Sequence, residues 1–109
     1  LQDRETTFQR YKTSNPNLSD EKYEAYFKQH NGFELVNSFP ADKANSVRWY
    51  IDCGDDDPRC ENNAKLHTMM NLKGIPNEFR VRNGDHTWEY WRTALPEVLA
   101  FISQSFHQF

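Results

Sequence analysis

The chain has 109 residues, a formal net charge of −3 and a pI near 5.8, so its length suits one domain with a modest core. An acidic chain without a basic face is not expected to bind nucleic acid, and no run of about 18 apolar residues suggests a membrane span. We therefore expect neither nucleic acid nor a membrane as a partner. No signal peptide is visible, and the sequence leaves the cellular location open.

Residues 1–43 are predicted to form a helical connector region. Weak patterns suggest a short helix over residues 3–12 and another over 33–38. Between them, Ser19 is suited to capping a helix that runs to about His30, because its hydroxyl can accept from the free amide of Lys22. Gly32 is then expected to end this helix in a left-handed conformation.

Residues 44–109 follow a different pattern, which alternates strands and helices. We predict strands over 47–53 and 78–82, because apolar and more polar residues alternate there. A helix over 62–73 lies between them, with Gly74 as its cap, and a last helix begins at Pro96. Its apolar stripe consists of Val98, Leu99, Ile102 and Phe106, with Phe101 alongside.

The order strand, helix, strand, helix is typical of a parallel sheet with crossover helices, and hence of an α/β fold. Two parallel strands do not form a stable sheet alone, and their open edges can pair with another chain. We therefore interpret residues 44–109 as the last part of a larger α/β sheet.

The ends of the two predicted strands carry the side chains that suggest chemistry. The first strand leads into Gly54 and three acids, Asp55, Asp56 and Asp57, and the second leads through Gly84 to His86. In open parallel sheets, sites form beyond the carboxyl ends of the strands, and adjacent strands lie about 4.8 Å apart. An acid there can hold one nitrogen of His86 and leave the other free as a general base. The spacing alone favours a solvated turn and an incidental histidine over such a pair.

Four short motifs carry a resemblance to a known family. They occur in order over residues 44–106: YIDCGDDD at 50–57, LH at 66–67, GIPNE at 74–78 and GDHTWEYWR at 84–92. Together they resemble the C-terminal part of the putative-esterase family of α/β-hydrolases. That family includes S-formylglutathione hydrolases, tributyrin esterases, and feruloyl or acetyl-xylan esterases.

The resemblance implies a serine hydrolase that cleaves a small acyl ester or thioester without a cofactor. The triad histidine falls on His86 and the triad acid on Asp57, with Asp55 and Asp56 as alternatives because Pro58 departs from the family pattern. Trp88 is expected to contact substrate. The nucleophile elbow Gly-x-Ser-x-Gly occurs nowhere in these residues, so we expect an N-terminal half of the hydrolase domain, or a second copy, as a partner.

Other interpretations stay open at this point. The chain can instead be a non-catalytic interaction module that assembles through its open sheet edge. The three acids can form a cation-binding loop, although further oxygen ligands are missing. Cys53 and Cys60 are expected to be free thiols, one of them buried in a strand. A zinc site that joins them to His67 and His86 matches no usual spacing.

Overall fold

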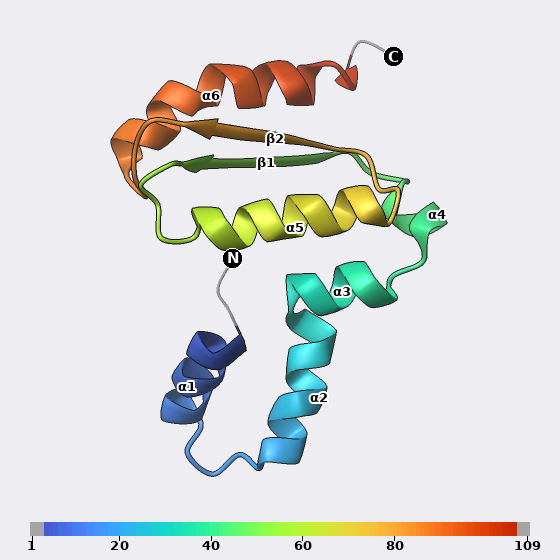
Figure 1. Cartoon of the computed structure of the whole chain (residues 1–109), viewed down its shortest axis with the longest axis vertical. Coiled ribbons are helices and arrows are strands. Elements are labelled where there is room, and N and C mark those ends of the chain that lie inside the picture. The colour runs from blue at the N-terminus through green and yellow to red at the C-terminus, as the bar shows by residue number, and fades with distance from the viewer. Residues whose placement is uncertain (1–3, 107–109) are drawn as a thin grey trace.

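The structure, a computed structural model, describes residues 4–106. Six helices and two strands follow one another in this part of the chain (Figure 1). Four helices come first: α1 (Arg4–Ser14), α2 (Asp20–His30), α3 (Gly32–Ser38) and α4 (Ala41–Ala44). A strand–helix–strand–helix unit follows: β1 (Trp49–Gly54), α5 (Cys60–Leu72), β2 (Asn77–Arg82) and α6 (Trp88–Ser103).

Local capping explains the N-terminal helices. The side chain of Ser19 accepts a hydrogen bond from the amide of Lys22, as predicted, and α2 ends at His30. The prediction for Gly32 was wrong, because Asn31 closes α2 with its own amide and then caps α3. Its side chain accepts from the amides of Phe33 and Glu34, so two consecutive helices share one polar residue and no left-handed glycine is needed.

The two strands pair in parallel, which confirms the prediction of a parallel sheet with a crossover helix. In their register Trp49 lies opposite Asn77, and Gly54 lies opposite Arg82. Both strands consequently end at the same edge of the sheet. The turn after α5 uses Gly74 at φ +71°, a conformation that glycine adopts without a steric penalty.

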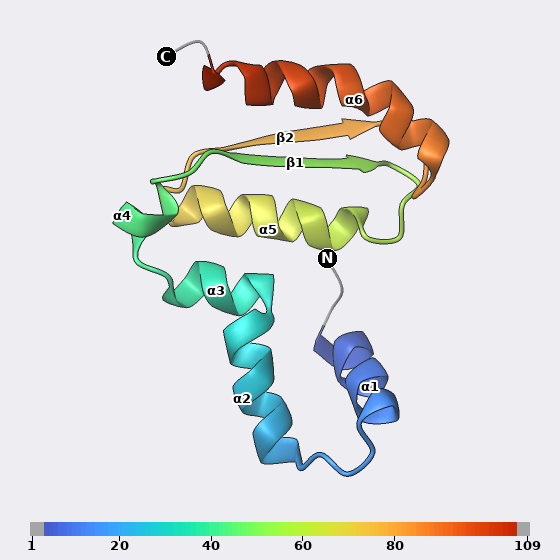
Figure 2. The ribbon, with the colours of Figure 1, turned by 180° about the vertical axis from the view of Figure 1, so that it is seen from behind.

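The sheet lies between two helices. In Figures 1 and 2, α5 covers one face and α6 the other, while α3 packs below α5. A small core fills the α5 side. It is built from buried Ala44, Met70 and Ile75, and from the partly buried side chains of Val36, Ile51 and Leu66.

Helix α6 begins eight residues earlier than predicted, at Trp88 instead of Pro96. The side chain of Thr87 caps it by accepting from the amide of Tyr90. Pro96 therefore lies inside the helix, where its missing N–H removes one backbone hydrogen bond. Burial of Tyr90 and Ala94 against the sheet offsets that loss.

The apolar stripe that we predicted on this helix is only partly covered. Phe101 packs on Tyr50 of β1, whereas Leu99, Ile102 and Phe106 are exposed.

The molecule is extended for its length. Its radius of gyration is 16.2 Å, against ~13 Å for a compact domain of about 100 residues. Between residues 4 and 106, no helix has the length and apolar character that crossing a bilayer requires.

Candidate active site

The loops that leave β1 and β2 are joined directly to each other. The amide of Asp55 donates to the carbonyl of Arg82 at 2.8 Å, and the amide of Asp56 donates to the carbonyl of Gly84 at 2.8 Å. The amide of Gly84 donates back to Oδ1 of Asp55 at 3.0 Å. These bonds extend the parallel pairing past the sheet edge and hold the two loops in one arrangement.

Two glycines allow this close approach. A Cβ on Gly54 would lie 2.2 Å from the carbonyl oxygen of Gly84, far inside a normal contact. Gly84 itself has φ +142°, and a Cβ there would lie 2.7 Å from the ring of Tyr90. A side chain at Gly54 would therefore force the two loops apart, and one at Gly84 would be strained by its positive φ and would press on Tyr90.

Asp57 is the acid that meets His86. Its carboxylate is buried, and Oδ2 lies 2.8 Å from Nδ1 of the histidine. Oδ1 accepts from the amide of Arg59 at 2.9 Å. Burial raises the pKa of Asp57, but the hydrogen bonds from Arg59 and His86 and the charges of both residues outweigh it, so the pKa lies below its usual value.

Asp55 and Asp56 differ from Asp57 in position. Both are exposed, and the carboxylate of Asp55 already accepts from the amide of Gly84. Within the described residues only Asp57 has a carboxylate bonded to the ring of His86.

The imidazole of His86 is held at one nitrogen and open at the other. Since a carboxylate can only accept, Nδ1 carries the proton in the Asp57 hydrogen bond and Nε2 has a lone pair in the neutral ring. The side chain is 44% exposed. Trp91 supports it with an edge contact at 4.9 Å between ring centroids. This arrangement suits Nε2 to accept a proton from a nucleophile.

The three aromatic residues after His86 occupy different environments in the first turn of α6. Tyr90 is buried. Trp91 lies between His86 and Trp88, and Trp88 meets it edge-on at 5.1 Å. The indole of Trp88 is 76% exposed and is free to contact another molecule beside the histidine.

Sequence reasoning missed the polar network beneath the site. The carboxylate of Asp52 accepts from the hydroxyls of Tyr50 and Tyr90 and from the guanidinium of Arg82. The hydroxyl of Tyr90 also lies 2.6 Å from the carbonyl oxygen of Cys53. Burial and the bond to Asp52 raise the pKa of Tyr90 to about 12. The network fastens the start of α6, and therefore the His86 loop, to the sheet.

A signal for this network was present in the sequence. The alternation in β1 places Tyr50 and Asp52 on the face opposite to Trp49 and Ile51. We interpreted these polar residues as the more exposed side of the strand. The structure instead covers that face with α6, so Tyr50 and Asp52 are partly buried there.

Within the described residues, Cys53, Cys60 and His67 do not come together as a metal site. Cys53 and Cys60 are free thiols, and Cys53 is buried, as expected. Burial and the neighbouring Cys60 thiol raise the pKa of Cys53 to about 11, which keeps it protonated at neutral pH. The ring of His67 bonds to Asn77 at 2.6 Å. Across residues 4–106, no three His, Cys, Asp or Glu side chains are grouped to hold a metal ion.

Comparison with known proteins adds independent information. A comparison with curated proteins found no match. Among solved structures, a ferulic acid esterase is similar, with 37% sequence identity and a TM-score of 0.63. The match covers 66% of this chain and 28% of that protein, so the chain spans about a quarter of the length of that relative.

The family comparison covers more of the chain. The model of the family described as "Esterase: Putative esterase" matches residues 16–102. With the structural similarity, this match indicates an α/β-hydrolase-like fold, of which the two parallel strands and their crossover helix are a part. The chain therefore belongs to the putative-esterase family.

Proposed function

We propose that this chain is the C-terminal part of a serine carboxylesterase-type hydrolase and supplies the histidine and the acid of its catalytic triad. The observation that carries the proposal is the 2.8 Å contact between Nδ1 of His86 and Oδ2 of Asp57 at the common end of two parallel strands. Family membership supports the reaction class. The triad order of the fold, with the acid before the histidine, agrees with residues 57 and 86.

The proposed mechanism is acyl transfer. A serine outside these 109 residues attacks the carbonyl carbon of an ester or thioester, and Nε2 of His86 takes the serine proton. The same proton passes to the leaving alcohol or thiol, and an acyl-enzyme remains. Water then gives a proton to Nε2 and attacks the acyl-enzyme, which releases the acid and restores the serine.

In this mechanism Asp57 acts through His86. Its carboxylate fixes the tautomer with Nε2 unprotonated and stabilises the imidazolium that forms during each proton transfer. The low pKa of Asp57 keeps the carboxylate ionised for this role. Trp88 is proposed as a substrate contact, because its indole is exposed and lies next to the Trp91–His86 pair.

The experiment uses the chain alone and a chimera. Residues 1–109 are expected to hydrolyse p-nitrophenyl acetate no faster than their His86→Ala variant, because a base without a nucleophile or oxyanion hole does not turn over. In the chimera, this chain replaces the region of the ferulic acid esterase that it matches. We expect esterase activity to fall about 10⁶-fold with His86→Ala and about 10⁴-fold with Asp57→Asn.

If a folded chimera keeps its full esterase activity in both variants, His86 and Asp57 are not the histidine and the acid of the triad. Circular dichroism confirms that each variant folds. His86-dependent turnover by the 109-residue chain alone would instead contradict the proposal that the nucleophile lies outside it.

One observation favours a second function, which is a non-catalytic interaction module. The described residues contain a two-stranded sheet in which each strand keeps one unpaired edge, and exposed apolar side chains lie along α6. This alternative predicts a stable oligomer in light scattering. A monomer at all concentrations tested would reject it.

A further inference from the structure

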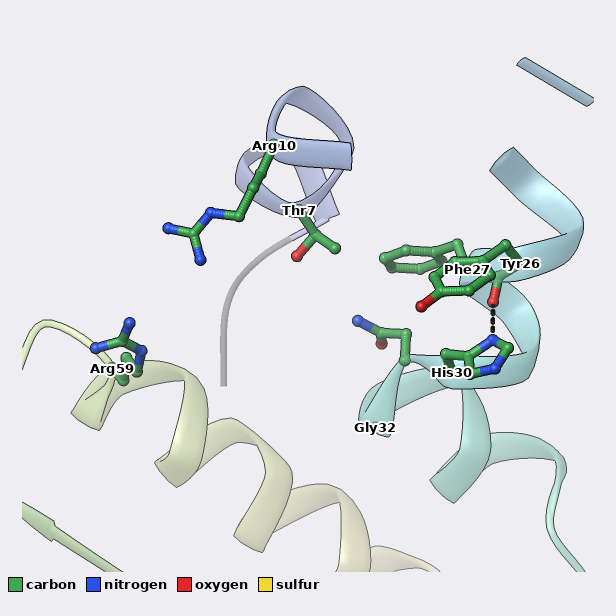
Figure 3. Close-up of a pocket in the computed structure, with 8 residues that line it drawn as sticks. Thr7, Arg10, Tyr26, Phe27, His30, Gly32 and Arg59 are labelled. Atoms are coloured by element: carbon green, nitrogen blue, oxygen red, sulfur yellow. Dashed lines mark hydrogen bonds between the residues drawn. The ribbon is translucent and has the colours of Figure 1, made fainter. Parts of the chain in front are cut away.

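A polar cavity lies away from the His86 site, between α1, α2 and the start of α5. Its volume is about 370 Å³, which is within the range of small-molecule sites. Figure 3 shows Arg10 and Arg59 on one side of the cavity and the α2 residues Tyr26, Phe27 and His30 on the other. The lining combines cationic, hydroxyl and imidazole groups with aromatic surface.

The charge of this cavity is unusual for an acidic chain. The protein has 16 acidic residues, yet no Asp or Glu is among the described residues that line the cavity. Two guanidinium groups that face one volume repel each other, and an anion between them removes that repulsion. The cavity therefore favours a negatively charged occupant.

Neither guanidinium group is held in an ion pair by the described residues. Elsewhere in the chain, Arg48, Arg80 and Arg82 donate to side-chain or backbone oxygens. By contrast, no carboxylate among residues 4–106 forms an ion pair with the guanidinium of Arg10 or Arg59. Two carboxylates lie two residues from Arg59: Glu61 pairs with Lys65, and Asp57 pairs with His86, although the charge of Arg59 also helps to lower the pKa of Asp57.

The opposite wall adds ring faces and one hydroxyl donor. Nδ1 of His30 donates to the carbonyl of Tyr26 at 2.8 Å, so Nε2 has a lone pair in the neutral ring and the imidazole contributes mainly its flat face to the wall. The Tyr26 ring is stacked between Tyr11 and His30, so its hydroxyl is the polar group it can offer a ligand.

We propose that this cavity binds an oxyanion, either a carboxylate or a phosphate monoester, attached to a small planar or aromatic body. Arg10 and Arg59 form charge-assisted hydrogen bonds to the oxyanion, and the geometry of guanidinium matches both groups. The cavity is larger than the anionic group alone, and its aromatic wall accommodates the uncharged remainder. The proposal does not depend on ester hydrolysis, since it concerns binding by the 109-residue chain.

Isothermal titration calorimetry at low ionic strength tests this site with three probes of similar shape. Benzoate represents the carboxylate, phenyl phosphate the phosphate monoester, and benzamide is the neutral comparison. We expect at least one anion to bind at least tenfold more tightly than benzamide, with weaker binding at high salt. The anion that binds more tightly identifies the chemical class.

Three substitutions locate the binding. Arg10→Gln and Arg59→Gln are each expected to weaken anion binding about tenfold or more, as loss of a charge-assisted hydrogen bond does. Arg92→Gln is the matched control, because it removes the same charge from an exposed position on α6 that does not line the cavity. Circular dichroism and thermal unfolding confirm that each variant is folded.

Arg10→Gln is the more discriminating variant, because Arg10 lies on α1, whereas Arg59 lies two residues after Asp57 and its amide donates to that carboxylate. Equal binding of benzamide and both anions would overturn the proposal. So would an equal loss of affinity in Arg92→Gln, or no detectable binding of either anion by the wild-type chain.

Discussion

The strand-containing part of the molecule is held mainly by bonds between residues far apart in sequence, whereas the hairpin of α1 and α2 is held by bonds between residues close in sequence. Around the candidate site, the decisive bonds join residues far apart in sequence, such as Asp57 with His86 and Arg82 with Asp52. In the hairpin, the bonds are local. Lys12 reaches Asp20, and the rings of Tyr11 and Tyr26 stack across the turn between the two helices.

The difference explains why the acid and the histidine can form a defined site. A catalytic pair needs its partners fixed to a fraction of an ångström, and long-range backbone pairing provides that restraint. The hairpin needs no such restraint, because helices with local contacts tolerate small shifts. We therefore expect substitutions in the strand region to have large effects and comparable substitutions in the hairpin to have small ones.

The largest effect is expected from Gly54→Ala. Its Cβ would lie 2.2 Å from the carbonyl of Gly84, so the two site loops must separate. We expect a loss of about 2–3 kcal/mol in the free energy of unfolding, which is typical of overpacking. Urea denaturation measures it. Gly74→Ala is the control, since it meets no atom within 4 Å and costs only about 1 kcal/mol of backbone strain. Equal costs for both variants would contradict the close approach of the loops.

The next effect is expected from Tyr90→Phe. It removes a hydroxyl that donates to Asp52 and lies within hydrogen-bonding distance of the Cys53 carbonyl, and we expect a loss of about 2 kcal/mol, as for hydrogen bonds to charged groups. Tyr26→Phe removes a hydroxyl with no hydrogen-bond partner among residues 4–106 and should cost less than about 0.5 kcal/mol. Thermal unfolding compares the two. A similar change in both would show that the Asp52 network does not anchor α6.

Acid sensitivity is expected to depend on Asp57. Because its folded pKa is below the unfolded value of about 3.9, the carboxylate contributes stability at every pH above that unfolded value. This stability is lost as the pH falls from about 4 through the folded pKa. Urea denaturation between about pH 2 and 7 should therefore show a smaller decline in Asp57→Asn than in the wild type. Parallel curves would mean that His86 and Arg59 do not lower this pKa.

The smallest effect is expected from Lys12→Ala in the hairpin. The ion pair with Asp20 is 2.6 Å long, but three quarters of the Asp20 side chain is exposed. Such pairs contribute about 0.2–1 kcal/mol, and salt screens them. We expect a loss within that range that shrinks in about 1 M salt. A loss as large as that of Gly54→Ala would contradict the division between the two regions.

The local features of the fold could be predicted from the sequence because their causes are local. The Ser19 cap needs an amide three residues away, and the Gly74 turn needs only its own φ. The parallel pairing followed from element order, and the presence of acids and a histidine after two such strands indicated one common edge.

The errors arose where packing between distant residues decides the outcome. Proline is disfavoured inside helices, so the sequence predicts that the last helix begins at Pro96. In the structure, Tyr90 and Ala94 are buried against the sheet, and α6 begins before the proline, at Trp88. The burial of Asp52 depends on the same helix. No pattern within β1 shows which helix covers that face, and the choice of Asp57 among three adjacent acids likewise depends on loop geometry.

The measurement that tests the central claim most directly is the tautomer of His86 by ¹⁵N NMR at about pH 8.5, where an ordinary imidazole is neutral. We predict a proton on Nδ1 and a bare Nε2, with the preference lost in Asp57→Ala, because the carboxylate holds the Nδ1 proton. A proton on Nε2 in the wild-type chain, or the same tautomer mixture with and without Asp57, would contradict the claim that these residues form a prepared acid–histidine pair.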